Sequence, residues 1–173
     1  KKRKSNMDVS KTTAFVEENF TNSALPCLQE YIKIPNTSRS YDPDWQTNGY
    51  TEKACDLLVN WVKSQNLKGL KLEVQHDEGK TPLIFIEIDG TENNDKTVLF
   101  YGHFDKQPPF DGWYEGYGAT IPVLTEDGTK LYGRGSSDDG YAIFASILSI
   151  KACQEQNIPH ARCVVIIESD EES

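Results

Sequence analysis

The sequence lacks the features of membrane and secreted proteins. No apolar stretch among its 173 residues is long enough to cross a membrane, and the N-terminus has no hydrophobic secretory signal. Its four cysteines include no C-x-x-C pair, so we interpret them as small buried hydrophobic residues in a reducing compartment. These absences predict a soluble cytoplasmic protein without a membrane partner. An organellar protein whose transit peptide has been removed remains an alternative.

An excess of positive charge is also absent. The chain has 18 Lys and Arg against 27 Asp and Glu, a net charge of −9, which disfavours a nucleic acid as partner. The one basic cluster is KKRK at residues 1–4. We interpret residues 1–10 as a solvated basic tail, in preference to a nuclear address or a nucleic-acid-binding arm. Residues 11–173 are long enough for one domain-sized unit.

Apolar periodicity predicts helices that alternate with strands. Helical spacing occurs over 15–20, 25–32 and 54–62, and residues 139–153 are apolar almost all round, as in a buried helix. Strand patterns cover 70–74, 83–88, 97–102 and 162–168, with a hairpin around Asp127-Gly128. Because 83–88 and 97–102 are nearly continuous apolar runs, both are expected to be covered on two faces. The pattern predicts an α/β fold, a three-layer sandwich with a largely parallel central sheet.

Polar residues gather where three of these segments end. TVLFYG leads into HFDKQPP, KLYGRG leads into SSDDG, and CVVII leads into ESDEES. In open α/β sheets, ligands collect beyond the carboxyl ends of the strands, because the loops converge there. The candidate functional residues are therefore expected in these three segments.

The first segment contains a histidine and an acid two residues apart, His103 and Asp105. On an extended chain their side chains project from the same face. Asp105 can then accept the spare ring N–H of a metal-bound His103 and fix its tautomer. A histidine that is simply hydrogen-bonded to a nearby acid at a strand end is the alternative.

The other two segments supply carboxylates. Asp138 and Asp139 stand where a helix begins, and they either cap that helix or place one carboxylate between two cations. Glu171 and Glu172 either lie at another helix N-terminus or divide two tasks, one binding metal and the other taking a proton from water. One imidazole and several carboxylates at one edge form the ligand set of a hydrolytic zinc site, which also accepts cobalt or manganese.

The motifs GHFDKQPPFDGW, LYGRGSSDDG and ESDEES resemble those of a known family, in its order and at its approximate spacing. This family is the dinuclear zinc metallopeptidases of peptidase family M twenty, which include carnosinase, cytosolic non-specific dipeptidase, aminoacylase and glutamate carboxypeptidase. The resemblance runs from about Leu25 to Ser173. Gln107-Pro108 and Gly112-Trp113 are most similar to the dipeptidase branch.

The resemblance implies a role for each matching residue. His103 corresponds to a ligand of one zinc ion, and Asp105 to the residue that orients its ring. Asp138 corresponds to the carboxylate that bridges the two zinc ions, and in the family the peptide bond after it is cis. Glu171 corresponds to the general base, and Glu172 to a ligand of the second zinc ion.

Two features depart from the family pattern. Gly140 stands where the family usually has lysine. In addition, the family completes its two zinc sites with a further carboxylate and a distant histidine, and a lid domain makes substrate and dimer contacts; these would lie beyond Ser173. The resemblance therefore implies that residues 11–173 are the N-terminal portion of a catalytic domain. That portion is expected to bind metal poorly and to be inactive alone, and the full-length protein is expected to be a homodimer.

The expected function is zinc-dependent hydrolysis of a dipeptide-like amide bond, with a small peptide or an acyl amino acid as substrate. An N-acyl amino acid deacylase and a non-catalytic, peptidase-like structural subunit remain alternatives. Competent residues at every visible site position favour the enzyme. Glu168 and Asp170 are expected to be supporting or plain loop residues, and His76 and His160 to be solvated loop residues.

Overall fold

The structure is a computed structural model that describes residues 6–91 and 95–173. The basic run at residues 1–4 lies outside the described residues. Helix α1 (Val9–Asn19) begins within the tail expected over residues 1–10. Asp8 starts this helix, because its carboxylate accepts a hydrogen bond from the backbone N–H of Lys11 at 3.1 Å and satisfies a donor that has no partner within the helix.

The N-terminal helices form one continuous run where two separate helices were expected. Helix α1 passes through a π-helical segment, Phe20–Ala24, into α2 (Leu25–Ile32). Pro26 stands in the first turn of α2. Because proline has no N–H and its ring clashes with the preceding turn of a regular α-helix, a wider turn before Pro26 lets the helical run continue.

The remaining elements agree with the sequence pattern, except the short helix α3, which the pattern did not predict. The helices are α3 (Trp45–Asn48), α4 (Tyr50–Ser64) and α5 (Ala142–Glu155). The strands are β1 (Leu70–Gln75), β2 (Leu83–Ile88), β3 (Thr97–His103), β4 (Val123–Leu124), β5 (Leu131–Tyr132) and β6 (Arg162–Glu168). Strands β4 and β5 form the expected small hairpin. Among the described helices, none combines the length and the apolar character that crossing a bilayer requires.

The α/β fold is confirmed, but the sheet is mixed where a largely parallel one was expected. Its four strands are ordered β1-β2-β6-β3, and β3 runs parallel to β6 while β1–β2 and β2–β6 are antiparallel. The short loop between β1 and β2 returns the chain as a hairpin, and this connection requires antiparallel strands. The parallel β3–β6 pair is the part of the sheet that positions the polar motifs.

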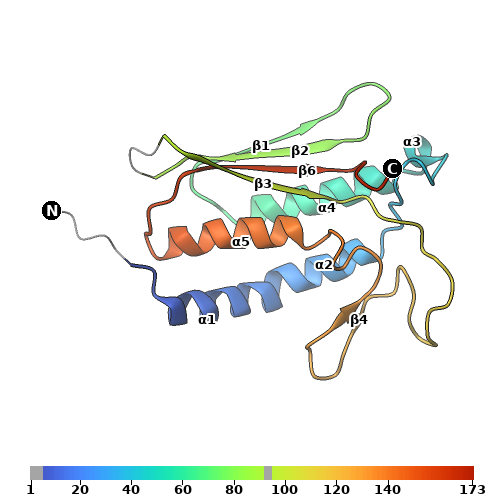
Figure 1. The fold of residues 1–173 in the computed structure, drawn as a ribbon, viewed down its shortest axis with the longest axis horizontal. Coiled ribbons are helices and arrows are strands. Elements are labelled where there is room, and N and C mark those ends of the chain that lie inside the picture. Colours follow the sequence, from blue (N-terminus) through green and yellow to red (C-terminus); the bar gives the residue numbers. More distant parts are fainter. Residues whose placement is uncertain (1–5, 92–94) are drawn as a thin grey trace.

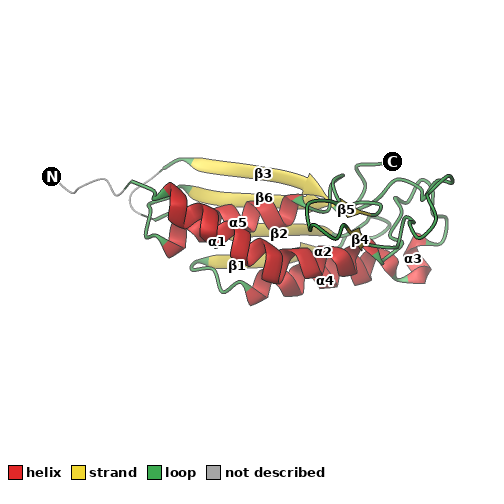
Figure 2. Ribbon diagram, turned by 90° about the horizontal axis from the view of Figure 1, so that it is seen from below, coloured by secondary structure: helices red, strands yellow, loops and turns green. Residues whose placement is uncertain are grey.

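The helices of the described residues cover one face of the sheet. Figure 1 shows α1, α2, α4 and α5 on the same side of the strands, and Figure 2 shows the strands side by side behind them. The expectation that β3 is covered on two faces is therefore wrong for the described residues: Leu99 is 62% exposed and Tyr101 is 55% exposed. Strand β2 alternates between buried and half-buried residues, which a strand with one well-covered face is expected to do.

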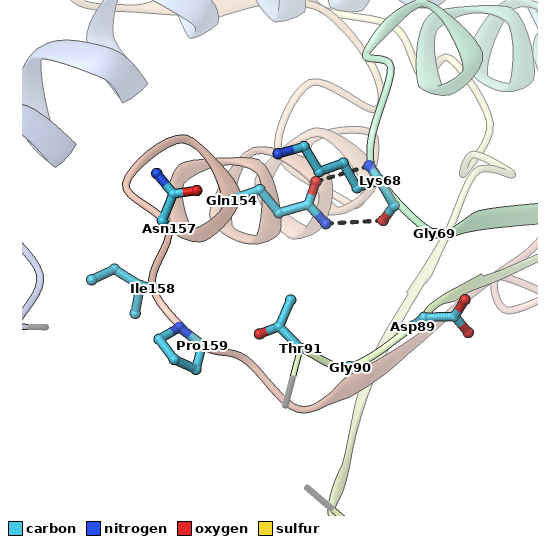
Figure 3. A pocket seen from close by; sticks show the side chains of 9 residues that line it. All are labelled: Lys68, Gly69, Asp89, Gly90, Thr91, Gln154, Asn157, Ile158 and Pro159. Atoms are coloured by element: carbon cyan, nitrogen blue, oxygen red, sulfur yellow. Dashed lines mark hydrogen bonds between the residues drawn. The ribbon is translucent and has the colours of Figure 1, made fainter. Parts of the chain in front are cut away.

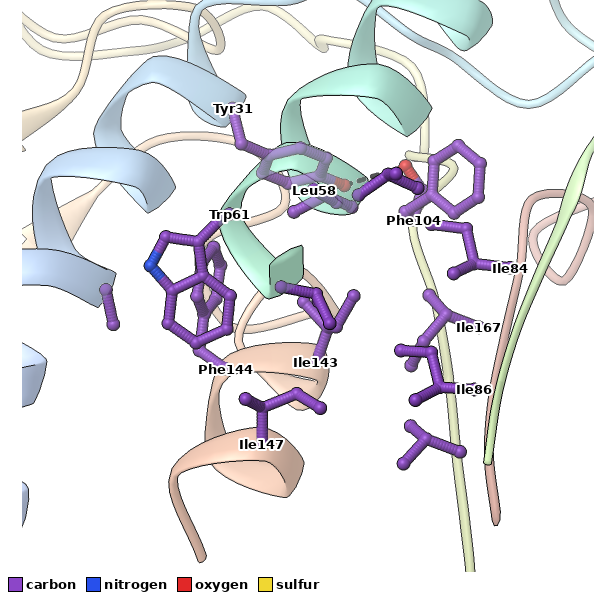
Figure 4. Packing of buried hydrophobic residues seen from close by; sticks show 14 of the residues in the cluster. Tyr31, Leu58, Trp61, Ile84, Ile86, Phe104, Ile143, Phe144, Ile147 and Ile167 are labelled. Atoms are coloured by element: carbon purple, nitrogen blue, oxygen red, sulfur yellow. Dashed lines mark hydrogen bonds between the residues drawn. The ribbon is translucent and has the colours of Figure 1, made fainter. Parts of the chain in front are cut away.

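The hydrophobic core lies between the sheet and these helices (Figure 4). Ile84, Ile86 and Ile167 from the strands face Leu58 of α4 and the apolar side chains of α5. Trp61 of α4 meets Phe144 of α5 edge to face, with ring centroids 4.5 Å apart, an arrangement that aromatic pairs prefer. The core fixes the sheet against α4 and α5 and leaves the strand ends free to carry polar residues.

We predict that a leucine of α4 that packs on one face of the sheet and a leucine on the other face of β3 differ sharply in their contribution to stability. Leu58→Ala, at a fully buried position, should lower the free energy of unfolding by about 2–5 kcal/mol. Leu99→Ala should change it by less than about 0.5 kcal/mol. Urea denaturation of both variants measures the difference. A loss at Leu99 as large as that at Leu58 would show that the outer face of β3 is covered.

Candidate metal centre

The three polar motifs meet at one edge of the sheet. Because β3 and β6 are parallel neighbours, with His103 opposite Glu168, the segments that follow both strands leave the sheet at the same edge. The backbone N–H of Phe104 extends the pairing by donating to the carbonyl oxygen of Glu168 at 2.7 Å. Figure 1 shows the C-terminus, which follows β6, beside the segment that leaves β3.

His103 is buried at the centre of this edge, with 5% of its surface exposed. Its Nδ1 lies 3.3 Å from Oδ1 of Asp105. Its Nε2 lies 3.2 Å from Oδ1 of Asp138 and 3.7 Å from Oε2 of Glu171. Nδ1 of the imidazole therefore contacts one carboxylate, and Nε2 faces two others.

Asp105 ties the ends of two strands together. Besides its contact with His103, this carboxylate accepts hydrogen bonds from the backbone N–H groups of Glu171 at 3.3 Å and Glu172 at 3.0 Å. Asp105 is 2% exposed, so these bonds form away from solvent, where they are stronger than in water. The carboxylate that contacts the imidazole thus also bonds to the backbone of the two glutamates.

Gln107 holds the side chain of Glu172. The sequence had not suggested this contact. Its Nε2 donates to Oε2 of Glu172 at 2.6 Å. The other carboxylate oxygen of Glu172, Oε1, is buried and has no hydrogen-bond partner among the described residues. Burying a carboxylate oxygen without a hydrogen bond or a counter-charge costs free energy. A cation bound to Oε1 would remove this cost, so the arrangement fits a cation site. The alternation of His103, Asp105 and Gln107 along an extended segment is the signal that could have identified Gln107.

The sequence allowed Asp138 and Asp139 to cap the helix that follows them, but they do not cap α5. The helix begins later, at Ala142, and its N-cap is Tyr141. Asp138 instead lies beside Nε2 of His103, and Oδ2 of Asp139 accepts a hydrogen bond from the backbone N–H of His103 at 3.2 Å. The peptide bond between the two aspartates is cis, as the family resemblance implied.

The structure also explains the glycine at position 140. A Cβ atom there would lie 2.5 Å from Cε1 of Tyr31 and would collide with the carbonyl oxygen of Gly135. The backbone N–H of Gly140 donates to this same oxygen at 2.9 Å. The loop from Gly135 to Gly140 therefore packs too closely on α2 to admit the lysine that the family usually has.

The acids shift the pKa of His103 upward. Desolvation lowers it, but the hydrogen bond to Asp105 and the charges of Asp105, Asp139 and Glu171 outweigh this effect and raise the pKa to about 9. Burial raises the pKa of Asp105, yet its hydrogen bonds with His103, the Glu172 backbone and Ser38 lower it overall. The metal-free site therefore favours a charged imidazolium beside a charged carboxylate.

The described residues fit a divalent cation. One ligand atom from each of His103, Glu171 and Glu172 can be chosen so that all three lie within 4.8 Å of one another. A further acid is nearby, since Oδ1 of Asp138 lies 3.2 Å from Nε2 of His103. An imidazole and carboxylates are the donor set that zinc, cobalt and manganese accept.

The neighbouring acids and the other two histidines contact residues outside the cluster. Glu168 accepts a hydrogen bond from the Tyr101 hydroxyl at 2.6 Å, and Asp170 forms an ion pair with Arg39 at 2.9 Å. His76 contacts Glu52 on the surface. His160 lies in the loop before β6, where its backbone N–H donates to the hydroxyl of Thr91. None of these described contacts involves His103.

Two cavities lie away from the cluster of His103 and its acids. One, of about 330 Å³, is at the opposite end of the sheet, where Gln154 forms two hydrogen bonds with the backbone of Lys68 (Figure 3). The other, of about 690 Å³, lies between the hairpin and the segment that contains Trp113 and Tyr114. The aromatic pair thus lines a cavity with Tyr132 of the hairpin, and the acids gather elsewhere.

Comparison with known proteins confirms the family resemblance. Residues 99–173 match the family described as Peptidase family M20/M25/M40. An uncharacterized metallohydrolase of Methanocaldococcus jannaschii is 33% identical over 159 residues, which are 86% of this chain and 38% of that protein. The Beta-Ala-His dipeptidase of Homo sapiens is 41% identical over 97 residues, 53% of this chain and 18% of that protein. Residues 99–173 are therefore similar to part of an M20 peptidase domain.

The fold agrees with this assignment. The solved structure of a di-peptidase from Saccharomyces cerevisiae superimposes with a TM-score of 0.75 at 20% sequence identity, over 98% of this chain and 36% of that one. The chain thus spans less than two fifths of the length of these relatives.

We predict that Asp105→Asn lowers the pKa of His103 from about 9 toward its usual value, because the variant loses the negative charge beside Nδ1 and keeps only a neutral, weaker acceptor. Protons compete with a metal for the imidazole, so apparent zinc affinity should fall as the pH drops below about 9. NMR titration of the metal-free chain measures the pKa. Glu52→Gln, which removes the acidic partner of the exposed His76, is the control and should leave His103 unchanged. A His103 pKa near 6.5 in both variants would contradict the role of Asp105.

Proposed function

We propose that this chain forms part of the active site of a metal-dependent dipeptidase. The observation that carries the proposal is the buried imidazole of His103, held by Asp105 on one side and facing the carboxylates of Asp138 and Glu171 on the other. The match of residues 99–173 to a peptidase family supports peptide hydrolysis. The names of relatives, Beta-Ala-His dipeptidase and di-peptidase, support a dipeptide as substrate.

The proposed cofactor is a pair of zinc ions, with manganese or cobalt as alternatives. His103 and Asp138 would hold one ion, and Asp138 and Glu172 the other. Catalytic zinc usually has three protein ligands, so each ion would take one more from elsewhere in the complete protein. When bound, such ions polarise a scissile carbonyl and lower the pKa of water.

The residues of this chain then have separate tasks. Asp105 holds a proton on Nδ1 of His103, so that Nε2 presents its lone pair to the cation. Glu171 accepts the proton of the attacking water on its carboxylate and delivers it to the departing amine nitrogen. Gln107, which binds Oε2 of Glu172 at 2.6 Å, leaves the other oxygen of that carboxylate free for the cation. The homodimer and the cytoplasmic location that the sequence suggested stay predictions.

We predict that Glu171→Gln in the complete protein reduces kcat for dipeptide hydrolysis by about 10²–10⁴-fold, because an amide cannot take the proton from water. Metal content, measured by atomic emission, should stay close to that of the parent protein. Glu126→Gln, a change at an acid in the β4–β5 hairpin, is the control and should keep full activity. Full turnover with Glu171→Gln would contradict the assignment of the base.

A substrate panel separates the proposed function from its alternatives. Dipeptides should be hydrolysed faster than N-acyl amino acids when zinc or manganese is supplied. A preference for acyl amino acids would indicate a deacylase. The absence of turnover on both classes by the metal-loaded complete protein would indicate a non-catalytic subunit.

The 173-residue chain alone should bind zinc weakly and show little dipeptide turnover, since two ligands for each ion seldom hold a catalytic metal. Isothermal titration with zinc and a dipeptide assay on the same sample measure both properties. Turnover comparable to that of the complete protein would show that the ligands have been assigned wrongly.

A further inference from the structure

Lys106 is a buried cation directly beside the metal centre, and the proposed reaction does not use it. The residue is 2% exposed. Among residues 6–91 and 95–173, no carboxylate forms an ion pair with its Nζ. A buried lysine without an acidic partner is uncommon, because charge is costly to remove from water. Desolvation indeed lowers the pKa of Lys106 from 10.5 to about 7.

The end of helix α2 and the residues that follow it supply the partners that the ammonium needs. Nζ of Lys106 donates to the carbonyl oxygens of Tyr31 at 2.9 Å, Ile32 at 3.4 Å and Ile34 at 2.7 Å. It also lies 4.1 Å from the centroid of the Tyr31 ring, close enough for a cation–π contact. The last carbonyls of a helix have no partner within it and carry the negative end of the helix dipole. A lysine is therefore well suited to this position.

Further hydrogen bonds join the same two segments. The hydroxyl of Tyr31 donates to the carbonyl oxygen of Phe104 at 2.8 Å, and the side-chain amide of Asn36 donates to the same oxygen. The backbone N–H of Ser38 donates to the carbonyl oxygen of Lys106 at 2.9 Å. Figure 4 shows the Tyr31 ring reaching across to Phe104. The segment that leaves β3 is thus fastened along its length to the end of α2.

Side chains alternate along this extended segment. Phe104 and Lys106 are buried toward α2 and the core. Asp105 instead accepts the backbone N–H groups of both glutamates, and Gln107 donates to the carboxylate of Glu172. Lys106 therefore stands between the two residues that hold Glu171 and Glu172, and its anchor lies on the side away from them.

We propose that Lys106 is a positioning residue of the metal centre. Its ammonium fastens the segment Phe104–Gln107 to the carboxyl end of α2, and this contact sets Asp105 and Gln107 at the distances at which they hold Glu171 and Glu172. The proposal deepens the proposed function, since the site that Lys106 positions is the site to which we assign dipeptide hydrolysis.

The test is Lys106→Met, which keeps an unbranched side chain of nearly the same length and removes its charge and its donors. Hydrogen exchange of the metal-free chain, at a temperature where it is folded, reports on the backbone N–H groups of Glu171 and Glu172. We expect exchange at both to accelerate about tenfold or more relative to the buried amides of β6. Apparent affinity for Zn²⁺, from competition with a chelator, should fall about 10–100-fold, the usual effect of losing a residue that supports metal ligands.

Lys151→Met is the matched control. Lys151 is half-buried and bonds to Asn19 and Gln65, away from the site, so its loss should leave both measurements unchanged. If Lys106→Met does not fold, Lys106→Gln, which keeps an amide donor for the carbonyls, should show the same changes at smaller size. A variant that only lowers the melting temperature, with Glu171 and Glu172 exchange and Zn²⁺ affinity unaltered, would overturn the proposal. Neither measurement requires catalysis, so a failure of the proposed function would show separately, as a metal-loaded protein without turnover.

Discussion

The parallel pairing of β3 with β6 is the constraint on which the metal centre depends. The register places His103 opposite Glu168, so the residues that follow each strand emerge together. A shift of one residue would turn His103 to the other face of the sheet. Asp105 then converts this proximity into fixed geometry, because one carboxylate contacts the imidazole and accepts the N–H groups of both glutamates.

Much of this site could be predicted from the sequence, because its chemistry is concentrated in three short motifs at segment ends. The pairing of His103 with Asp105 followed from their spacing of two residues, and the structure shows the contact at 3.3 Å. The two interpretations of Asp138 could not be separated by pattern, since a helix cap and a carboxylate between two cations use the same residue type. The late start of α5, at Ala142, excludes the helix cap.

Other features depend on which segments meet, and local pattern does not contain that information. The apolar run of β3 predicted burial on two faces, but what covers a strand is decided by elements far away in the sequence. Lys106 is the converse case, a charged residue that is buried. A lysine in a polar loop reads as solvated, and its burial becomes intelligible only when the carbonyls of Tyr31 and Ile34 are seen to surround it. Gln107 gains its role only from the nearby carboxylate of Glu172.

The π-helical segment Phe20–Ala24 has a consequence for residues far from it. Each residue of an α-helix turns the chain by about 100°, so one additional residue in a turn changes the face that everything after it presents. Before this segment, α1 packs on α5; after it, α2 packs on α4 and presents Tyr31 to Lys106. The segment therefore acts as a rotational offset between two halves of one helical run. Removing a single residue there would swing the Tyr31 ring away from the ammonium. The acids of the candidate metal centre would then shift, although none of them is substituted.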